Sequence, residues 1–509
     1  MSGDLFFGGE KTTRQNFEEY SRKIAKVLHD RGVAPDDVVA ILMRNDVTYL
    51  AAMEACRYVG AYFATVNWHS SMKEIRHILE DSGAKVLIAH CDLLEPLDLN
   101  GSSSLDTLAF PTPSVIQGQY GVESYDSPNA QDTLGLIADT SIFGGEAKPL
   151  RGLFAYTAGS TGRPKGIKRQ ISEEGPDLFS IYGQLARSVL AMKPGDKYLI
   201  AAPFYHSAPN NLSVAGLAAG DVDLHISAKF DPESFLTEIE EHRISHIYMV
   251  PTMAIRLLKL PPEIRSKYDV SSLEFAISTG SPFPSDVKQQ IIDWLGPIVF
   301  EAYGASEIGI MTLISSQESM EKPGSVGKPL PGASIVILDE NRQPIPTGEE
   351  GEIFINLAMF GDFDYTNAEG DISNQRYDGH VTVGDVGYFD EDGFLFISDR
   401  KKDMIISGGA NIFPAEIEAA LIEMPEIMDC AVFGAPDPEF GETIVAAVQT
   451  LDNVEVTIDE VQQFLEPMIA RFKIPKKVDL HRELPREDSG KIFKQRLREP
   501  YWQSANRTI

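Results

Sequence analysis

Short apolar segments alternate with helical patterns along most of the chain, and this alternation limits the folds that the chain can adopt. Residues 46–59, for example, form a helical pattern between the apolar segments 38–43 and 62–66. Strands that alternate with helices form parallel sheets with helices on their faces. Further apolar segments of this kind are 85–89, 153–156, 198–202, 246–250, 275–278 and 298–300. We therefore predict an α/β protein with a mostly parallel, helix-covered sheet.

The residues that directly follow the predicted strands are the first candidates for a site. In parallel sheets, ligands bind beyond the carboxyl ends of the strands. The residues in question are Thr157, Pro203, Thr279 and Ala302. By contrast, segment 92–149 is rich in Ser, Pro, Gly and Asp, and we predict surface loops there and no site.

The pattern changes in the last third of the chain. Residues 326–399 form short apolar runs separated by Gly, Pro and Asp, which predicts a β subdomain resembling a barrel. Residues 404–509 alternate helix and strand again. This last segment is predicted to be a small α+β domain.

Charge and cysteine content exclude several classes of protein. The 509 residues include 75 acidic and 45 basic ones, a formal net charge of -30. Such a field repels nucleic acids and anionic lipid surfaces, so we expect neither as a partner. The three cysteines, Cys56, Cys91 and Cys430, are far apart, which predicts no disulfide framework or zinc site and a reducing compartment. With no signal peptide and no long apolar run, we expect no membrane span and a cytoplasmic location.

The densest chemical motif is the glycine-rich and hydroxyl-rich segment 156–166, which follows a predicted strand. Glycines let backbone N–H groups converge on an anion, and Thr157, Ser160 and Thr161 add hydroxyl donors. Lys165 supplies a mobile positive charge. The segment is not a Walker A loop, because Pro164 precedes the lysine and no Ser or Thr follows it. It favours phosphate binding over the alternative of a flexible surface loop.

A second motif, Glu-Ala-Tyr-Gly-Ala-Ser-Glu at 301–307, follows an apolar strand. Tyr303 could stack on a base, Ser306 could donate to a phosphate, and Glu307 could hold a magnesium ion. An ordinary strand-to-helix turn is the alternative.

Two further motifs lie nearer the carboxyl terminus. Asp385 in segment 384–393 is suited to accept both hydroxyl groups of a ribose, although a turn-capping aspartate has the same spacing. Lys491 sits on a glycine-containing turn in segment 484–492. Residues 471–498 contain a local excess of basic side chains that could meet phosphates, and surface lysines are the alternative.

In this order, these motifs resemble the adenylate-forming superfamily, which includes acyl-CoA synthetases, firefly luciferase and peptide-synthetase adenylation domains. The resemblance extends from about Thr12 to Arg498. It implies a large amino-terminal domain, 1–401, that binds an acid and ATP, and a small mobile carboxyl-terminal domain, 402–509, joined at a hinge near Lys402. It also implies Mg²⁺ and coenzyme A, and an acyl-adenylate intermediate.

The resemblance also assigns roles by position. Lys491 would bridge the attacking carboxylate and the α-phosphate, and Glu307 would bind the metal. His206 would form a wall of the acid pocket. The alternative for His206 is a neutral histidine that only packs against its neighbours. The nucleotide would contact the residues that match the family motifs. These are Thr157, Ala158, Gly159, Ser160, Thr161, Gly162 and Lys165 for the phosphates, Gly280, Ser281, Pro282, Glu301, Ala302, Tyr303 and Gly304 around adenine, Ser306 for a phosphate, Asp385 and Arg400 for ribose, and Gly408 and Gly409 for the pantetheine tunnel.

A missing acidic residue and the net charge of the chain limit which substrates are expected. Segment 203–211 contains no acidic residue to pair an amino group, which disfavours an amino acid as the substrate. Carrier proteins are generally acidic, so the negative charge of this chain favours free coenzyme A. The residues predicted to line the acid pocket are mostly small or apolar, with one amide, which suits a fatty or aromatic acid. Its candidate residues are Ser207, Ala208, Asn211, Thr279, Ala305, Ile308 and Met311.

The sequence leaves other functions open. An adenylating enzyme that loads a carrier protein is one alternative, and a non-catalytic nucleotide-binding scaffold is another. The scaffold would be expected to lack Lys491 or Glu307, and a kinase or ATPase is opposed by the missing Walker A context. The sequence also leaves open whether the protein forms a homodimer.

Overall fold

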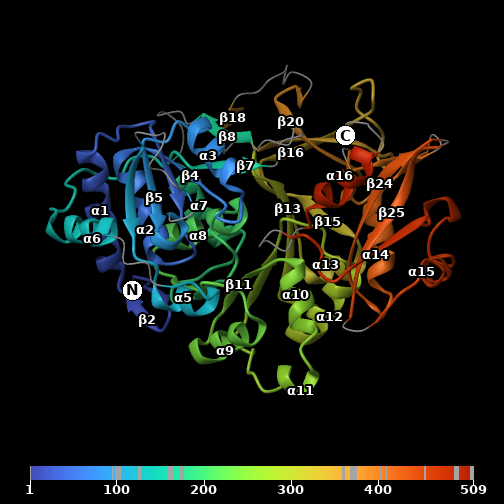
Figure 1. Cartoon of the computed structure of the whole chain (residues 1–509), viewed down its shortest axis with the longest axis horizontal. Coiled ribbons are helices and arrows are strands. Elements are labelled where there is room, and N and C mark those ends of the chain that lie inside the picture. Colours follow the sequence, from blue (N-terminus) through green and yellow to red (C-terminus); the bar gives the residue numbers. More distant parts are fainter. Residues whose placement is uncertain are drawn as a thin grey trace.

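The computed structural model describes residues 2–94, 97, 105–123, 128–157, 165–170, 177–357, 361–366, 375–401, 403–407, 410–438, 440–451, 454–486 and 492–504. Two large sheets and their helices make up the first four hundred residues, and a smaller sheet follows (Figure 1). The α/β class predicted from the alternation is confirmed.

The first sheet has seven strands in the order β18-β8-β7-β4-β3-β5-β6. Its central strands are parallel, and β8 and β18 add antiparallel at one edge. The strands are β3 (Val38–Leu42), β4 (Tyr62–Thr65), β5 (Val86–His90), β6 (Asp106–Phe110), β7 (Leu153–Thr157), β8 (Lys165–Gln170) and β18 (Asp362–Tyr365). Accompanying helices are α1 (Arg14–Asp30), α2 (Val47–Val59), α3 (Met72–Asp81), α4 (Cys91–Leu94), α5 (Ser114–Tyr120) and α6 (Pro128–Asp139). Segment 92–149, predicted as loops, therefore also contains an edge strand and two helices.

The second sheet has fourteen strands, in the order β16-β17-β20-β21-β15-β14-β13-β12-β11-β9-β10-β1-β2, with β19 paired to β20. Strands β1 and β9 to β13 are parallel, and the chain then turns back through an antiparallel hairpin. The strands up to this hairpin are β1 (Leu5–Phe7), β2 (Glu10–Thr12), β9 (Lys197–Ile200), β10 (Asp223–Ile226), β11 (His246–Met249), β12 (Phe275–Ser278), β13 (Val299–Ala305) and β14 (Gly309–Ile314). Because β13 continues to Ala305, Ala302 lies inside this strand and not beyond its end.

Helices α7 and α8 pack on each other, and α8 contacts β7 of the first sheet and β9 and β10 of the second. This pair therefore lies between the two sheets. The helices of this part are α7 (Leu178–Ser188), α8 (Ser207–Ala219), α9 (Pro232–His242), α10 (Pro251–Leu258), α11 (Pro262–Arg265), α12 (Ser285–Leu295) and α13 (Ser316–Glu321).

The segment predicted to resemble a barrel forms a β-rich extension of the second sheet. No pairing between described residues closes these strands into a barrel. They are β15 (Ser325–Pro329), β16 (Ala333–Leu338), β17 (Gly351–Leu357), β19 (Arg376–Tyr377), β20 (His380–Phe389) and β21 (Leu395–Arg400).

The carboxyl-terminal part forms a five-stranded sheet with helices, drawn in orange and red in Figure 1. Two clusters of buried apolar residues in this part, between Ile405 and Leu497, contain no residue from the larger part. Its elements are β22 (Ile405–Ser407), β23 (Ala410–Ile412), α14 (Pro414–Ile422), β24 (Ile427–Asp437), β25 (Gly441–Thr450), α15 (Ile458–Leu465), a 3-10 turn (Arg471–Lys473), β26 (Lys477–His481) and α16 (Lys494–Ser504). None of the described helices of the chain is long and apolar enough to cross a membrane.

Candidate active site

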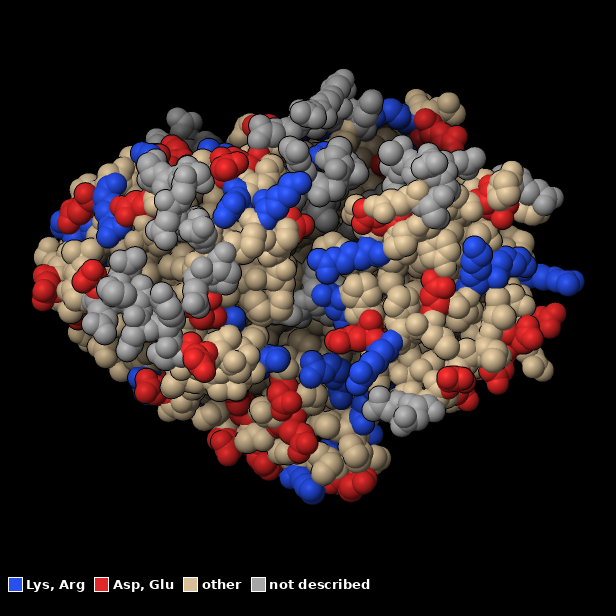
Figure 2. Space-filling view, in the orientation of Figure 1, with Lys and Arg blue, Asp and Glu red and all other residues tan. Residues whose placement is uncertain are grey.

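A cavity of about 890 Å³ lies where strand ends of both sheets approach the carboxyl-terminal part. Its walls include Thr65 and Tyr156 at the ends of β4 and β7, Val250 and Thr279 after β11 and β12, and Arg496 of α16. Figure 2 shows that the middle of this face is hollowed and that Lys and Arg side chains gather along the hollow. The charged residues that line the cavity include three basic ones, which could meet an anionic ligand, and five acidic ones. They are Lys165, Lys401 and Arg496, and Glu74, Glu307, Glu352, Asp385 and Glu499.

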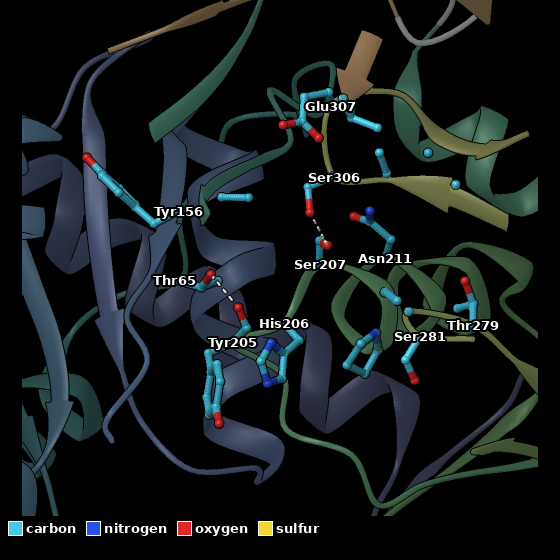
Figure 3. A pocket seen from close by; sticks show the side chains of 18 of the residues that line it. Thr65, Tyr156, Tyr205, His206, Ser207, Asn211, Thr279, Ser281, Ser306 and Glu307 are labelled. Carbon is cyan, nitrogen blue, oxygen red and sulfur yellow. Dashed lines mark hydrogen bonds between the residues drawn. The ribbon is translucent and has the colours of Figure 1, made fainter. Parts of the chain in front are cut away.

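The loop that carries His206 is held by buried polar groups. Asn45 Oδ1 accepts a hydrogen bond from the N–H of Phe204 at 2.8 Å, and Thr65 Oγ1 donates to the carbonyl oxygen of Tyr205 at 2.9 Å (Figure 3). The His206 ring lies 4.3 Å from the Tyr205 ring, and His206 is the N-cap residue of α8. The two hydrogen bonds hold the backbone of the loop that places His206 at the wall of the cavity.

Two serines from different elements meet inside the cavity. Ser207, in the first turn of α8, and Ser306, after β13, have their hydroxyl oxygens 2.7 Å apart (Figure 3). The buried Arg169 donates from Nη2 to the carbonyl oxygen of Ser306 at 3.0 Å. Burial lowers the pKa of this guanidinium, which still carries its charge at neutral pH. Arg169 thus holds the turn that carries Ser306.

Glu307 places a carboxylate in the same cavity. Its Oε1 accepts a hydrogen bond from the hydroxyl of Tyr365 at 3.0 Å, and Tyr365 also lines the cavity. Burial, together with the Glu307 charge, raises the pKa of Tyr365, so the phenol remains a donor. No group of three or more His, Cys, Asp and Glu side chains within the described residues could hold a metal by itself.

The predicted ribose carboxylate lines another wall. Asp385 of β20 is 5% exposed, and its Oδ2 accepts a hydrogen bond from the Tyr303 hydroxyl at 2.7 Å. Gly280 and Ser281 also line the cavity, while Arg400 pairs with Asp385 in the β20–β21 register. The geometry thus brings predicted adenine and ribose residues to one cavity.

Several predicted nucleotide residues lie elsewhere. Glu301 is buried in an ion pair with Lys288 of α12, and Ala302 is packed in the apolar core. Pro282 is exposed, and neither it nor the ring of Tyr303 is part of the cavity wall. These assignments stay predictions, and Glu301 has a structural partner that the sequence did not reveal.

The predicted phosphate loop is described only at its ends. Lys165 and Tyr156 line the cavity, and the N–H of Gly166 donates to Thr366 Oγ1 at 3.0 Å. The side chains of Thr157 and Arg400 lie outside the described part of the chain. Nine further predicted residues lie wholly outside it: Ala158, Gly159, Ser160, Thr161, Gly162, Lys402, Gly408, Gly409 and Lys491.

The carboxyl-terminal part contributes its own wall. Phe493, Gln495 and Arg496 line the cavity at the start of α16. Between them, Lys494 forms an ion pair with Glu418 of α14, with Nζ and Oε1 2.7 Å apart. The start of α16 is therefore anchored to α14 while it faces the cavity.

An apolar pocket extends from the cavity between α7, α8 and β11, and none of the residues that line it there is charged. Ser207, Ala208, Asn211, Thr279 and Ala305 were predicted and line the cavity (Figure 3 labels three of them). Ile308 and Met311, also predicted, are buried and are not part of its wall.

Sequence reasoning missed most of the wall of this apolar pocket. The spacing of Tyr182, Leu185 and Val189 on one face of α7 was the available signal, but this spacing is equally typical of a helix that packs on a core. The missed residues are Tyr182, Leu185, Val189 and Leu190 on and after α7, Leu212 and Ala215 on α8, and Tyr248 and Val250 on and after β11.

Comparisons with known proteins place this site in a family. Residues 4–358 match the AMP-binding enzyme family, and residues 416–491 match the AMP-binding enzyme C-terminal domain. Feruloyl-CoA synthase of an Amycolatopsis species is 33% identical over 494 residues, covering 96% of this chain and 94% of that protein. Indoleacetate–CoA ligase of Aromatoleum aromaticum is 31% identical and covers 94% of this chain and 91% of its own length.

A solved structure supports the same assignment. The o-succinylbenzoate coenzyme A synthetase of Bacillus subtilis, in complex with ATP and a magnesium ion, has a TM-score of 0.81 and 26% identity, and the match covers 97% of this chain and 96% of that one. The superfamily predicted from the four motifs is confirmed. The chain belongs to the AMP-binding enzyme family.

Proposed function

We propose that this enzyme activates a carboxylic acid with an uncharged, apolar tail and transfers the acyl group to coenzyme A. The reaction class predicted from the sequence, an AMP-forming acid–CoA ligase that uses ATP, Mg²⁺ and coenzyme A, is confirmed by the family match and the kinship with acid–CoA ligases. The nature of the acid and the roles of individual residues belong to the proposal.

The observation that carries the proposal is the continuity of two unlike regions in one cavity. One region presents Asp385, Glu307 and Lys165, which are suited to a nucleotide, and the other is the uncharged pocket between α7 and α8. A second charge on the acid would be buried there without a partner, which costs on the order of several kcal/mol. A monocarboxylic acid with an apolar tail fits both regions.

The residues present fit a magnesium–nucleotide complex. Mg²⁺ is usually held by one or two carboxylates together with the phosphates of a substrate and water. Glu307 offers such a carboxylate, and Ser306 beside it offers a hydroxyl for a phosphate oxygen. When bound, the ion would neutralise phosphate charge. Asp385 would hold the ribose, and Gly280 and Ser281 would lie against the adenine.

The reaction then has two chemical steps. A carboxylate oxygen attacks the α-phosphorus of ATP, the bond to the bridging oxygen of the β-phosphate breaks, and pyrophosphate leaves. The thiolate of coenzyme A next attacks the acyl carbon, and the bond to AMP breaks. The enzyme chiefly positions these groups and offsets their mutual repulsion. We assign this cationic role in the first step to Lys491, with Lys165 on the leaving pyrophosphate.

The placement of His206 suggests its role. His206 lines the cavity next to the Ser207–Ser306 pair, on a loop whose backbone is held by hydrogen bonds from Asn45 and Thr65. We assign it to the boundary between the acid pocket and the path of the thiol. Gly408 and Gly409, which the resemblance assigns to that path, remain part of this proposal.

Location and assembly complete the proposal. Cys56, Cys91 and Cys430 are buried free thiols, which fits a reducing compartment such as the cytoplasm. A homodimer stays a prediction, and the mass of the protein in solution tests it.

The decisive experiment measures the products formed from ATP across a panel of acids. We expect acid-dependent formation of AMP and pyrophosphate, followed by acyl-CoA when coenzyme A is added, with arylpropenoic, arylacetic and unbranched fatty acids among the active compounds. Malonate and succinate, which carry a second charge, should be poor substrates. Formation of ADP, or AMP release that needs no acid, would contradict the proposal.

A further inference from the structure

The apolar pocket has a measurable depth along helix α8. Its wall includes Ser207 in the first turn and Ala215 in the third. These residues are eight positions apart, which corresponds to about 12 Å of helix. The pocket therefore extends about two turns from the Ser207–Ser306 pair.

The second sheet gives an independent measure of the same depth. His246, Tyr248 and Val250 alternate along β11 and the residue after it, so their side chains face one side of the sheet. Tyr248 and Val250 line the cavity, whereas His246 contacts the loop after α7: its Nε2 lies 3.0 Å from the carbonyl oxygen of Leu190. Four residues of strand span about 13 Å. Leu190 thus lies at the level of His246, at the opposite end of β11 from Val250.

Leu190 is fixed in place by this contact. A carbonyl oxygen can only accept, so the Nε2 of His246 carries the proton and donates to it. Nδ1 of the same ring lies 2.9 Å from Ser245 Oγ. Burial lowers the pKa of His246, against the opposing effect of Asp196, so the ring is neutral and keeps this tautomer at neutral pH. Leu190 itself is 2% exposed and lines the cavity.

We infer that Leu190 closes the far end of the acid pocket and limits the acid to a tail of about 12 Å, with Ala215 setting the width there. This inference rests on the proposed function. An extended alkyl chain advances about 1.3 Å per carbon, because bonds of about 1.5 Å meet at tetrahedral angles, so about nine carbons fill this length. The substrate class is then an arylpropenoic or arylacetic acid, or a medium-chain fatty acid, and not a long-chain one.

A series of unbranched acids tests the inference on the intact enzyme. We would measure kcat/KM for pyrophosphate release with butanoate, hexanoate, octanoate, decanoate, dodecanoate and palmitate. Each added methylene that is buried should raise kcat/KM about 3- to 4-fold. The rise should stop near octanoate or decanoate, and palmitate should fall below the maximum by about 10-fold or more, because overpacking is destabilising.

Two variants should move this limit in opposite directions. Leu190→Ala removes the closing side chain, so the maximum shifts toward dodecanoate or longer acids. Ala215→Leu fills the same end, so the maximum shifts toward hexanoate while butanoate is still activated. Leu217→Ala is the matched control, because Leu217 is buried on α8 but does not line the cavity. It should lower stability and leave the chain-length profile unchanged.

The outcomes separate this inference from the proposed function. If no acid gives pyrophosphate, the proposed function fails. If acids are activated but palmitate is as good as octanoate, or if neither Leu190→Ala nor Ala215→Leu moves the maximum, the limit at Leu190 is wrong although the enzyme is a ligase. Should Leu190→Ala fail to fold, Leu190→Val and Ala215→Leu still decide between these results.

Discussion

The two parts of the chain differ in how they are held together. The larger part, up to residue 401, has an extensive apolar core that runs from Leu5 to Leu395 and surrounds the acid pocket. The carboxyl-terminal part packs around cores of its own and meets the larger part through polar contacts, such as the N–H of Ala415 with Asp399 Oδ2 at 2.9 Å. A few polar contacts are easier to exchange than an apolar core. We therefore expect the larger part to stay fixed while it binds the substrates, and the smaller part to move as a unit.

Each part also contains a Lys–Glu ion pair between a helix and a neighbouring element. Lys288 and Glu301 in the larger part have side chains only 5% and 6% exposed, whereas Lys494 and Glu418 are 25% and 23% exposed. Removing one charge of a buried pair leaves the other without a partner. The two pairs therefore offer a matched test of the difference between the parts.

The largest expected effect is on the buried pair. Glu301→Gln should lower the free energy of unfolding of the larger part by about 3–5 kcal/mol, measured by urea denaturation. Glu418→Gln should cost less, because water reaches Lys494. The KM for ATP of folded Glu301→Gln should be unchanged. A large rise in the KM for ATP, with the free energy of unfolding unchanged, would instead indicate that Glu301 contacts the nucleotide.

The next effect concerns the metal. Glu307→Gln should lower the rate of pyrophosphate release about 100-fold or more, because it removes the carboxylate that would hold the magnesium ion against the reacting phosphates. It should also raise the Mg²⁺ concentration needed for half-maximal rate. Tyr365→Phe removes only a hydrogen bond to that carboxylate and should cost about 3- to 10-fold. Equal effects of the two variants would contradict the metal role.

A smaller effect is expected at the ribose wall. Asp385→Asn should raise the Kd for ATP by about 10- to 100-fold, the value of a hydrogen bond to a charged group. Calorimetric titration without the acid gives this Kd directly. Tyr303→Phe keeps the carboxylate and is the control. An unchanged Kd for Asp385→Asn would favour the alternative of a structural aspartate.

The last effect, the smallest over a single pH unit, is a pH dependence of the stability of the larger part. Burial lowers the pKa of His225 in the larger part to about 3, so the unfolded chain binds a proton there at higher pH than the folded one does. Between about pH 6.5 and about pH 3, stability should fall by at most about 1.4 kcal/mol per pH unit from this group. His225→Gln should flatten that slope.

The sequence predicted the fold and the polar half of the site better than the apolar half. Strand and helix alternate with clear periods, and Glu307 and Asp385 belong to short contiguous motifs whose residue types suit phosphates and ribose. The wall at Tyr182, Leu190 and Tyr248 could not be predicted in the same way. These residues are far apart in the chain, and apolar side chains that line a pocket have the same pattern as those that fill a core.

The same limit explains the residues that lie elsewhere. Glu301 belongs to a predicted site motif, but its partner Lys288 comes from a separate helix, and only the folded chain brings them together. Ala302 was expected beyond a strand end. The hairpin with β14 extends that strand to Ala305, so Ala302 packs into the core.

The central claim is that the carboxyl-terminal part delivers a cation for the first step only. The direct test compares both half-reactions of Lys491→Ala, with the exposed Lys267→Ala as a control. Acid-dependent pyrophosphate release should fall about 100-fold or more, while transfer to coenzyme A from supplied acyl-adenylate stays close to the unmodified rate. An equal loss in both half-reactions, or no loss in the first, would contradict it.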